Sequence, residues 1–192
     1  MRKLSQQTRL IILLILSIAA ISYALFACGK VYENKVDSLN FKLTSTDIRQ
    51  DSLLPIEFTC DGSSATLPME WSGYPETTKW FALIMYTVAS PTDIHCYWVL
   101  YNIPGLVNSL VKNITGIGMV GNNSLNDKTG YSPPCSEGSG FKYYVYTINA
   151  LSDSVTFTVP PSAVSMAVLQ DAIKNITLSS ASLTVKYSRT FQ

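Results

Sequence analysis

The sequence predicts a single β-rich domain that carries one amphipathic helix late in the chain. Serine, threonine, valine and tyrosine crowd the part of the 192-residue chain that follows its first thirty residues, and such a composition favours strands over helices. Two segments, 80–86 and 96–103, are near-continuous apolar runs. Runs of this kind suit strands that are buried on both faces, as at the centre of a β-sandwich.

Further strands are indicated by the spacing of apolar residues. Apolar side chains alternate with polar ones over 39–43 and again over 56–58, which is the period of a half-buried strand. Segments 143–151 and 182–187 complete the predicted strands. Segment 122–140 is rich in Asn, Asp, Gly, Ser and Pro, so we expect a loop there.

One segment has the period of a helix instead. Ser165 is a residue type that caps helix N-termini, and the apolar residues around and after it recur at helical spacing. These residues, which we expect to share one buried face, are Val164, Val168, Leu169, Ala172, Ile173 and Ile176.

The first 27 residues have the pattern of a secretory signal peptide. Basic residues precede an apolar run over 10–20, and a small residue, Ala27, stands where cleavage would occur. Cys28 follows directly, as in the lipobox of bacterial lipoproteins, where the cysteine is acylated and becomes the new N-terminus. We therefore expect a lipid anchor on Cys28 that holds the protein on a membrane, facing the periplasm or the cell exterior.

An uncleaved transmembrane anchor is the alternative for this leader. The apolar stretch 10–27 is close to the roughly 20 residues that span a bilayer. Both interpretations export the same domain, because the basic N-terminal residues stay in the cytoplasm. In either case residues 28–38 form a short polar tether, and the folded domain covers 39–190.

The composition excludes several classes of function. The net charge is +1 and charged residues make up only 14% of the chain, so we expect no nucleic-acid partner. One histidine and scattered cysteines give no metal-ligand spacing. That histidine, His95, adjoins Cys96, but neighbours on a strand point to opposite faces and cannot form a catalytic dyad. We therefore expect a protein without catalytic residues, metal or cofactor.

Three cysteines remain after Cys28, an odd number for an oxidising compartment. Cys60 and Cys135 both lie in turn-like surroundings, whereas Cys96 lies within an apolar run. A buried thiol suits Cys96. We therefore predict a disulfide between Cys60 and Cys135.

The order of several motifs along the chain carries a family resemblance. The motifs are Phe58-Thr59-Cys60-Asp61-Gly62, the block 67–79 around Glu70-Trp71, the block 98–104, Lys128-Thr129-Gly130-Tyr131 with Pro134-Cys135, and Ala150-Leu151. Over 39–189 the chain resembles the phosphatidylethanolamine-binding protein family, in its bacterial branch of Raf-kinase-inhibitor-like proteins. The resemblance implies an antiparallel Greek-key β-sandwich, with a large sheet packed on a smaller one and a C-terminal helix. It also implies that Cys60 and Cys135 approach one another.

The same resemblance locates a candidate ligand pocket with altered residues. In the family, this pocket comprises an Asp-Pro-Asp-x-Pro turn, a His before Trp-Val, and a Gly-x-His-Arg turn. The first turn aligns with 87–91, the single His with Tyr97, and the second turn with 140–143. Both carboxylates, both histidines and the arginine are replaced. The candidate ligand-binding residues are thus Thr87, Ala89, Ser90, Pro91, Tyr97, Gly140, Lys142 and Tyr143.

Two functions remain open for such a pocket. In one, Lys142 supplies charge while Thr87 and Tyr97 supply hydroxyl donors, and the site binds a small anion or a phospholipid head group. In the other, the pocket is vestigial. The protein then acts on a protein partner through surface loops such as 122–140, as an inhibitor of a protease or kinase would.

Overall fold

The computed structural model describes residues 40–136 and 140–189. The predicted leader, the tether and Cys28 therefore lie outside the described residues. The strands are β1 (Lys42–Thr44), β2 (Met69–Ser72), β3 (Trp80–Ser90), β4 (Asp93–Pro104), β5 (Ser109–Leu110), β6 (Met119–Val120), β7 (Lys142–Leu151) and β8 (Thr177–Tyr187). The helices are the short 3₁₀ turns η2 (Ile56–Phe58) and η3 (Pro161–Ala163) and the α-helix α2 (Met166–Ile173).

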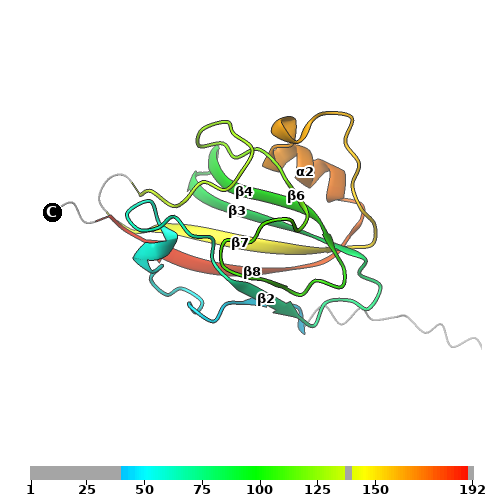
Figure 1. Ribbon diagram of the computed structural model, residues 1–192, viewed down its shortest axis with the longest axis horizontal. Coiled ribbons are helices and arrows are strands. Elements are labelled where there is room, and N and C mark those ends of the chain that lie inside the picture. The colour runs from blue at the N-terminus through cyan, green and yellow to red at the C-terminus, as the bar shows by residue number, and fades with distance from the viewer. Residues whose placement is uncertain (1–39, 137–139, 190–192) are drawn as a thin grey trace, which may run out of the picture. The chain divides into compact units, whose positions relative to one another are not determined.

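Two antiparallel sheets make up the sandwich. The large sheet has the order β6-β4-β3-β7-β8, and the small one has the order β1-β2-β5. In Figure 1 the long strands β4, β3, β7 and β8 lie side by side, with α2 above them and β2 below. The mainly β, two-sheet antiparallel architecture predicted from the sequence is confirmed.

The central strand β3 is buried on both sides, as its continuous apolar run predicted. Phe81, Leu83 and Met85 pack with the small sheet, on what we call the inner face of the large sheet. Ala82 and Ile84 alternate with them and pack with α2, on the outer face. This alternation follows from the period of two in a strand, and it separates the apolar interior into two layers.

Helix α2 begins where the sequence indicated. The Ser165 side chain accepts a hydrogen bond from the Val168 backbone N–H at 3.3 Å, which satisfies one of the free N–H groups of the first turn. Leu169 and Ile173 are buried. Val168 and Ala172 are exposed, so the predicted buried face was too wide, because a helix of eight residues covers the sheet with a narrow stripe. The helix is late in the chain, but β8 follows it, so it is not the C-terminal helix that was expected.

The strand predicted over 56–58 is wrong. These residues form the 3₁₀ turn η2, closed by a hydrogen bond from the Thr59 backbone N–H to the Ile56 carbonyl. Ile56 is 63% exposed and Phe58 is fully buried. A two-residue alternation that follows Pro55 fits a single tight turn as well as a strand, because Pro55 suits the entry to a helical turn.

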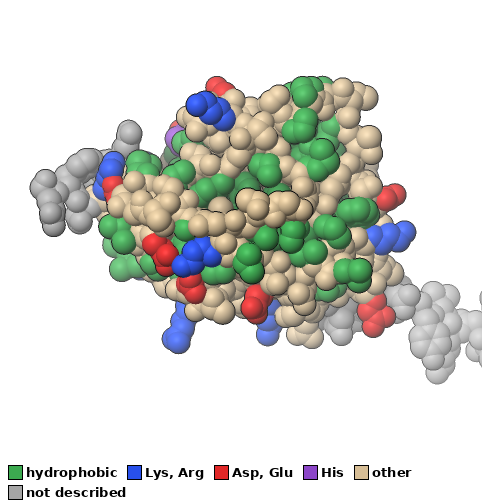
Figure 2. All heavy atoms as spheres, in the orientation of Figure 1, with side chains coloured by type: hydrophobic (Ala, Val, Ile, Leu, Met, Phe, Trp, Pro, Cys, Tyr) green, Lys and Arg blue, Asp and Glu red, His purple; other side chains and the backbone are tan. Residues whose placement is uncertain are grey.

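The described residues include no helix that is long and apolar enough to cross a membrane. Figure 2 shows one face of the molecule, on which charged side chains of both signs are few and scattered among hydrophobic and uncharged polar groups. That face carries no basic stripe of the kind that nucleic acid requires.

Candidate functional site

Two of the candidate pocket residues, Thr87 and Lys142, share the inner face at one end of the large sheet. Thr87 is buried near the end of β3, and its hydroxyl donates to the Tyr143 carbonyl on β7. Ala89 is exposed near the end of β3, at an irregularity where Val88 pairs with Ile94 and Ser90 with Asp93, so alternation along the strand does not place it on the inner face. Lys142 begins β7 and pairs with Tyr187 on β8. Tyr187 is part of the inner core, so Lys142 projects from the inner face as well.

Tyr97 enters the same region through an irregularity in β4. Trp98 pairs with Met85 and Cys96 with Tyr86, which leaves Tyr97 as the extra residue of a β-bulge. Both Tyr97 and Trp98 consequently point into the inner core. The Tyr97 ring lies 5.2 Å from the Tyr144 ring, edge to face. Tyr97 thus packs against Tyr144 in the inner core.

The other candidates lie elsewhere. Ser90 and Pro91 lie at the β3–β4 turn, where the Ser90 hydroxyl is 3.5 Å from that of Thr92. Tyr143 projects from the outer face and is 53% exposed. Gly140 is exposed just before β7 and has a φ of +96°, in the left-handed region that glycine tolerates best. The structure therefore does not bring Ser90, Pro91 or Tyr143 into the inner-face group.

A cluster of buried tyrosines lies beneath the inner-face group, and sequence reasoning missed it. Tyr144 and Tyr146 are fully buried. Their hydroxyls lie near those of Tyr97 and Tyr131 but make no hydrogen bond of regular geometry within the described residues. Burial raises the pKa of both, and the nearby Tyr97 hydroxyl adds to the effect on Tyr144. Alternating aromatics on a strand are ordinarily core residues, so no signal in the sequence marked this cluster of hydroxyls.

The disulfide predicted between Cys60 and Cys135 is present and borders this end of the sheet. The two Cα atoms are 5.2 Å apart. The Cys60 backbone N–H donates to the Pro134 carbonyl at 3.0 Å, and the Ser132 backbone N–H donates to the Tyr97 carbonyl at 2.9 Å. The disulfide loops are thereby attached to the bulge that holds Tyr97.

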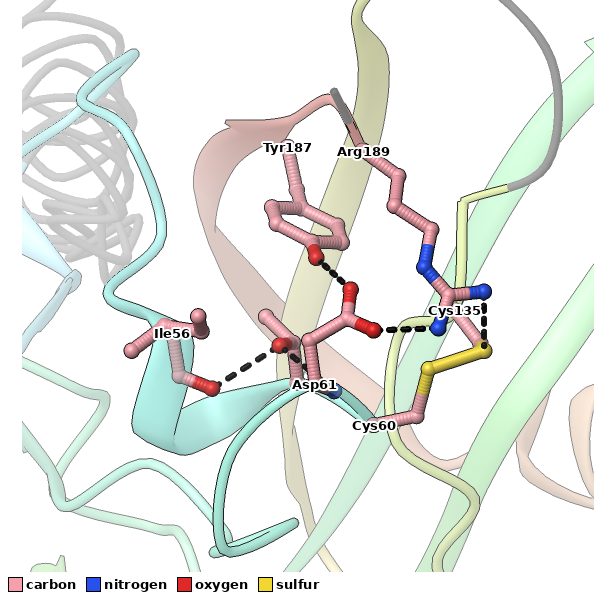
Figure 3. Close-up of a disulfide and its surroundings, with 7 residues drawn as sticks. Ile56, Cys60, Asp61, Cys135, Tyr187 and Arg189 are labelled. Carbon is pink, nitrogen blue, oxygen red and sulfur yellow. Dashed lines mark hydrogen bonds and ion pairs between the residues drawn. A yellow bond between two sulfur atoms is a disulfide. The ribbon is translucent and has the colours of Figure 1, made fainter. Parts of the chain in front are cut away.

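Asp61 links the disulfide loop to the end of β8 (Figure 3). Its carboxylate accepts hydrogen bonds from the Tyr187 hydroxyl and from the Arg189 guanidinium, and Arg189 also reaches the Cys135 sulfur at 3.8 Å. The hydrogen bond from Tyr187 and then the charge of Arg189 hold the pKa of Asp61 below its ordinary value. Neither Asp61 nor Arg189 is among the site residues that the sequence predicted.

His95 and Cys96 do not converge on one site within the described residues. His95 pairs with Asp93 at 3.0 Å near the surface, whereas Cys96 is buried in the outer-face core. Burial raises the pKa of the Cys96 thiol to about 11, which makes it a poor nucleophile. Within 40–136 and 140–189, no group of His, Cys, Asp and Glu side chains could hold a metal ion.

The sequence that folds into this sheet end also matches a known protein family. The sequence profile of the phosphatidylethanolamine-binding protein family matches residues 44–188. The chain belongs to this family. Two relatives named UPF0098 protein are 33% identical over 141 residues, in Methanothermobacter thermautotrophicus, and 30% identical over 140 residues, in Aquifex aeolicus. These matches cover 71% and 65% of this chain, and 91% and 81% of the relatives.

Solved structures of the phosphatidylethanolamine-binding protein fold superpose on this chain and agree with the family match. The chain superposes on Escherichia coli YbcL with a TM-score of 0.71 and 23% identity, covering 79% of this chain and 99% of YbcL. The homologue CT736 of Chlamydia trachomatis gives the same TM-score at 22% identity, covering 78% and 98%. The chain thus has the family's sequence profile over residues 44–188 and the fold of these solved structures.

Proposed function

We propose that this protein is a non-enzymatic binding module that holds a small anion or a phosphate-bearing head group at the inner-face end of the large sheet. The observation that carries the proposal is a cluster of buried tyrosine hydroxyls on the same strand face as Lys142, in which Tyr144 lies near Tyr97 and Tyr146 near Tyr131 without a hydrogen bond of regular geometry. Buried polar groups are normally hydrogen-bonded. A phosphate or carboxylate accepts hydrogen bonds from both hydroxyl and ammonium groups.

The charges at this end favour an anion over a zwitterion. Lys142 brings a fixed positive charge, while Thr87 and Ala89 stand where the family turn has carboxylates. The neighbouring carboxylate, Asp61, is already engaged by Tyr187 and Arg189. A head group that carries its own ammonium therefore finds no free carboxylate to pair with, which disfavours it relative to a plain anion.

Calorimetry on the full-length protein in detergent tests this proposal. Inorganic phosphate should bind more tightly than phosphoethanolamine. Lys142→Ala should weaken phosphate binding by about 1–3 kcal/mol, the range for a hydrogen bond to a charged group. Lys186→Ala is the matched control, because Lys186 pairs with the outward-facing Tyr143 on the opposite face of the sheet.

Two results would contradict a working pocket. Undetectable heats for both ligands with the wild-type protein would indicate a vestigial site and favour action through surface loops on a protein partner. Equal losses from Lys142→Ala and Lys186→Ala would mean that phosphate is attracted by general charge and not by the site.

We also propose that the domain is exported and tethered to a membrane through an acylated Cys28. The support is the leader sequence, with its basic start, apolar run and cysteine directly after Ala27. Such a tether would present the sheet-end site to ligands in the periplasm or at the cell exterior. A single N-terminal transmembrane anchor is the alternative outcome of the test described in the Discussion.

A further inference from the structure

The outer edge of the large sheet is only partly covered. The segment 50–54 runs along β8 and pairs with its C-terminal half. The Asp51 backbone N–H donates to the Thr184 carbonyl at 2.8 Å, and Lys186 exchanges backbone hydrogen bonds of 3.0 and 2.9 Å with Ser52 and Leu54. Thr184 and Lys186 therefore direct their backbone groups away from β7, towards the edge.

The preceding part of the same edge carries no partner strand. Because backbone direction alternates along an antiparallel strand, Ser182 and Ser180 also direct their N–H and C=O groups outward. Both residues are exposed, and no backbone hydrogen bond to these outward groups exists within the described residues. A row of unpaired N–H and C=O groups is a ready template for another extended chain.

A cavity of about 470 Å³ adjoins this uncovered edge. It lies between β8 and the stretch that leads from β1 to the covering segment. Phe41, Leu43, Ile48 and Leu183 contribute buried apolar surface to it. Strand β1 is itself the edge strand of the small sheet, because it pairs only with β2. The cavity is therefore flanked by the edges of both sheets.

The charged side chains that line the cavity are all positive. Its lining includes the cationic side chains of Lys42 and Arg49 and no acidic side chain. Neither cation forms an ion pair with another described residue. The two aspartates of the neighbouring loop, Asp47 and Asp51, accept hydrogen bonds from Thr46 and Gln50 instead. The cavity thus combines an apolar floor, free positive charge and an unpaired strand edge.

We propose that this groove binds an extended peptide segment of a protein partner, rich in alternating apolar and acidic residues, which adds a strand to β8 beside Ser180 and Ser182. Only an extended backbone satisfies a row of strand N–H and C=O groups. Apolar side chains on the cavity side of such a peptide would pack on the floor of the cavity, and neighbouring acidic side chains would meet Lys42 and Arg49 at its rim, where both cations are exposed. The groove lies further along β8 from Tyr187 and is separate from the sheet-end site.

Fluorescence anisotropy with the full-length protein and a labelled peptide of alternating Val and Glu tests this inference. Ser182→Pro removes the outward N–H without touching the bonds to β7, and proline is tolerated on edge strands. The matched control is Ser182→Ala, which keeps the N–H but loses the same hydroxyl contact with Thr147. We expect Ser182→Pro to weaken binding by about 10-fold or more, the effect of a lost hydrogen bond and the clash of the ring, and Ser182→Ala to leave it near wild type.

Two further arms keep the test independent of how well the proline variant folds. A peptide with Lys in place of Glu should bind at least about 10-fold more weakly to the wild type, and Lys42→Glu combined with Arg49→Glu should reverse that preference. A peptide with N-methylated backbone should not bind. Equal binding of the N-methylated peptide, or of the Lys peptide, would overturn the proposal. If the protein binds none of the peptides but binds dodecanoate, the proposal is overturned and the groove is assigned to an amphiphile instead.

The phosphate titration separates this proposal from the proposed function. Loss of phosphate binding in Lys142→Ala with intact peptide binding would leave the groove proposal standing. Loss of peptide binding in Ser182→Pro with intact phosphate binding would show that the variant is folded and that the edge is what the peptide needs.

Discussion

Asp61 is the single residue that connects most of the sheet-end structure. Its carboxylate joins the loop of the disulfide to two residues at the end of β8, Tyr187 and Arg189. Asp61 and Arg189 are 128 residues apart in the sequence. No local pattern predicts such a contact, because periodicity and turn signals report only on near neighbours. The same limit explains why the cluster of buried hydroxyls at Tyr144 and Tyr146 was not predicted.

Asp61 also makes a testable contribution to the pH dependence of stability. Its pKa in the folded protein lies below the ordinary value of 3.8, first because Tyr187 donates a hydrogen bond to it and then because of Arg189. A carboxyl group with a lowered folded-state pKa stabilises the fold above its ordinary pKa, and this contribution disappears as the pH falls through the folded-state value. Asp61→Asn should therefore lower the urea midpoint at neutral pH, and the difference from wild type should shrink below pH 3.8.

Glu76→Gln serves as the control for that measurement, because Glu76 is exposed and forms no ion pair with another described residue. A midpoint difference for Asp61→Asn that persists unchanged into strong acid would show that the loss comes from altered packing of the loop and not from the charge of Asp61.

At the scale of elements, the sequence was most informative where a pattern is long. The apolar runs predicted β3 and β4, and the helical period with Ser165 predicted the start of α2. The pattern over 56–58 was too short to distinguish a turn from a strand. The bulge that turns Tyr97 inward depends on the register between β3 and β4, which no single strand reveals. By contrast, the opposite directions of Lys142 and Tyr143 follow from strand alternation alone.

The disulfide contributes to stability by joining two loops that are far apart along the chain. Cys60 and Cys135 are separated by 75 residues, so their bond restricts the unfolded chain strongly. Replacing both by serine should lower the unfolding free energy by about 2–5 kcal/mol, the range for native disulfides, as measured by urea denaturation. Dithiothreitol should destabilise the wild type and leave the double variant unchanged. A double variant as stable as wild type would contradict this contribution.

At the scale of the whole molecule, the described domain and the N-terminal leader make separate predictions. Cys28→Ser should either release the protein from membranes or block its processing, because serine lacks the thiol to which the proposed lipid would be attached. Membrane fractionation and intact-mass spectrometry measure both effects. A variant that stays on the membrane, with a mass that differs from the wild type only by the exchange of cysteine for serine, would contradict the lipid anchor and favour the transmembrane alternative.

The burial of Cys96 has a consequence for how the Cys60–Cys135 disulfide of this chain forms. With a pKa of about 11, only about one such thiol in ten thousand is ionised at neutral pH, and the thiolate is the form that attacks disulfides. The odd cysteine is thus inert towards the Cys60–Cys135 bond once β4 has joined the sheet. Scrambled pairing and covalent dimers that involve Cys96 are confined to the interval before that step, so the order of oxidation and folding decides how much of this thiol is mispaired.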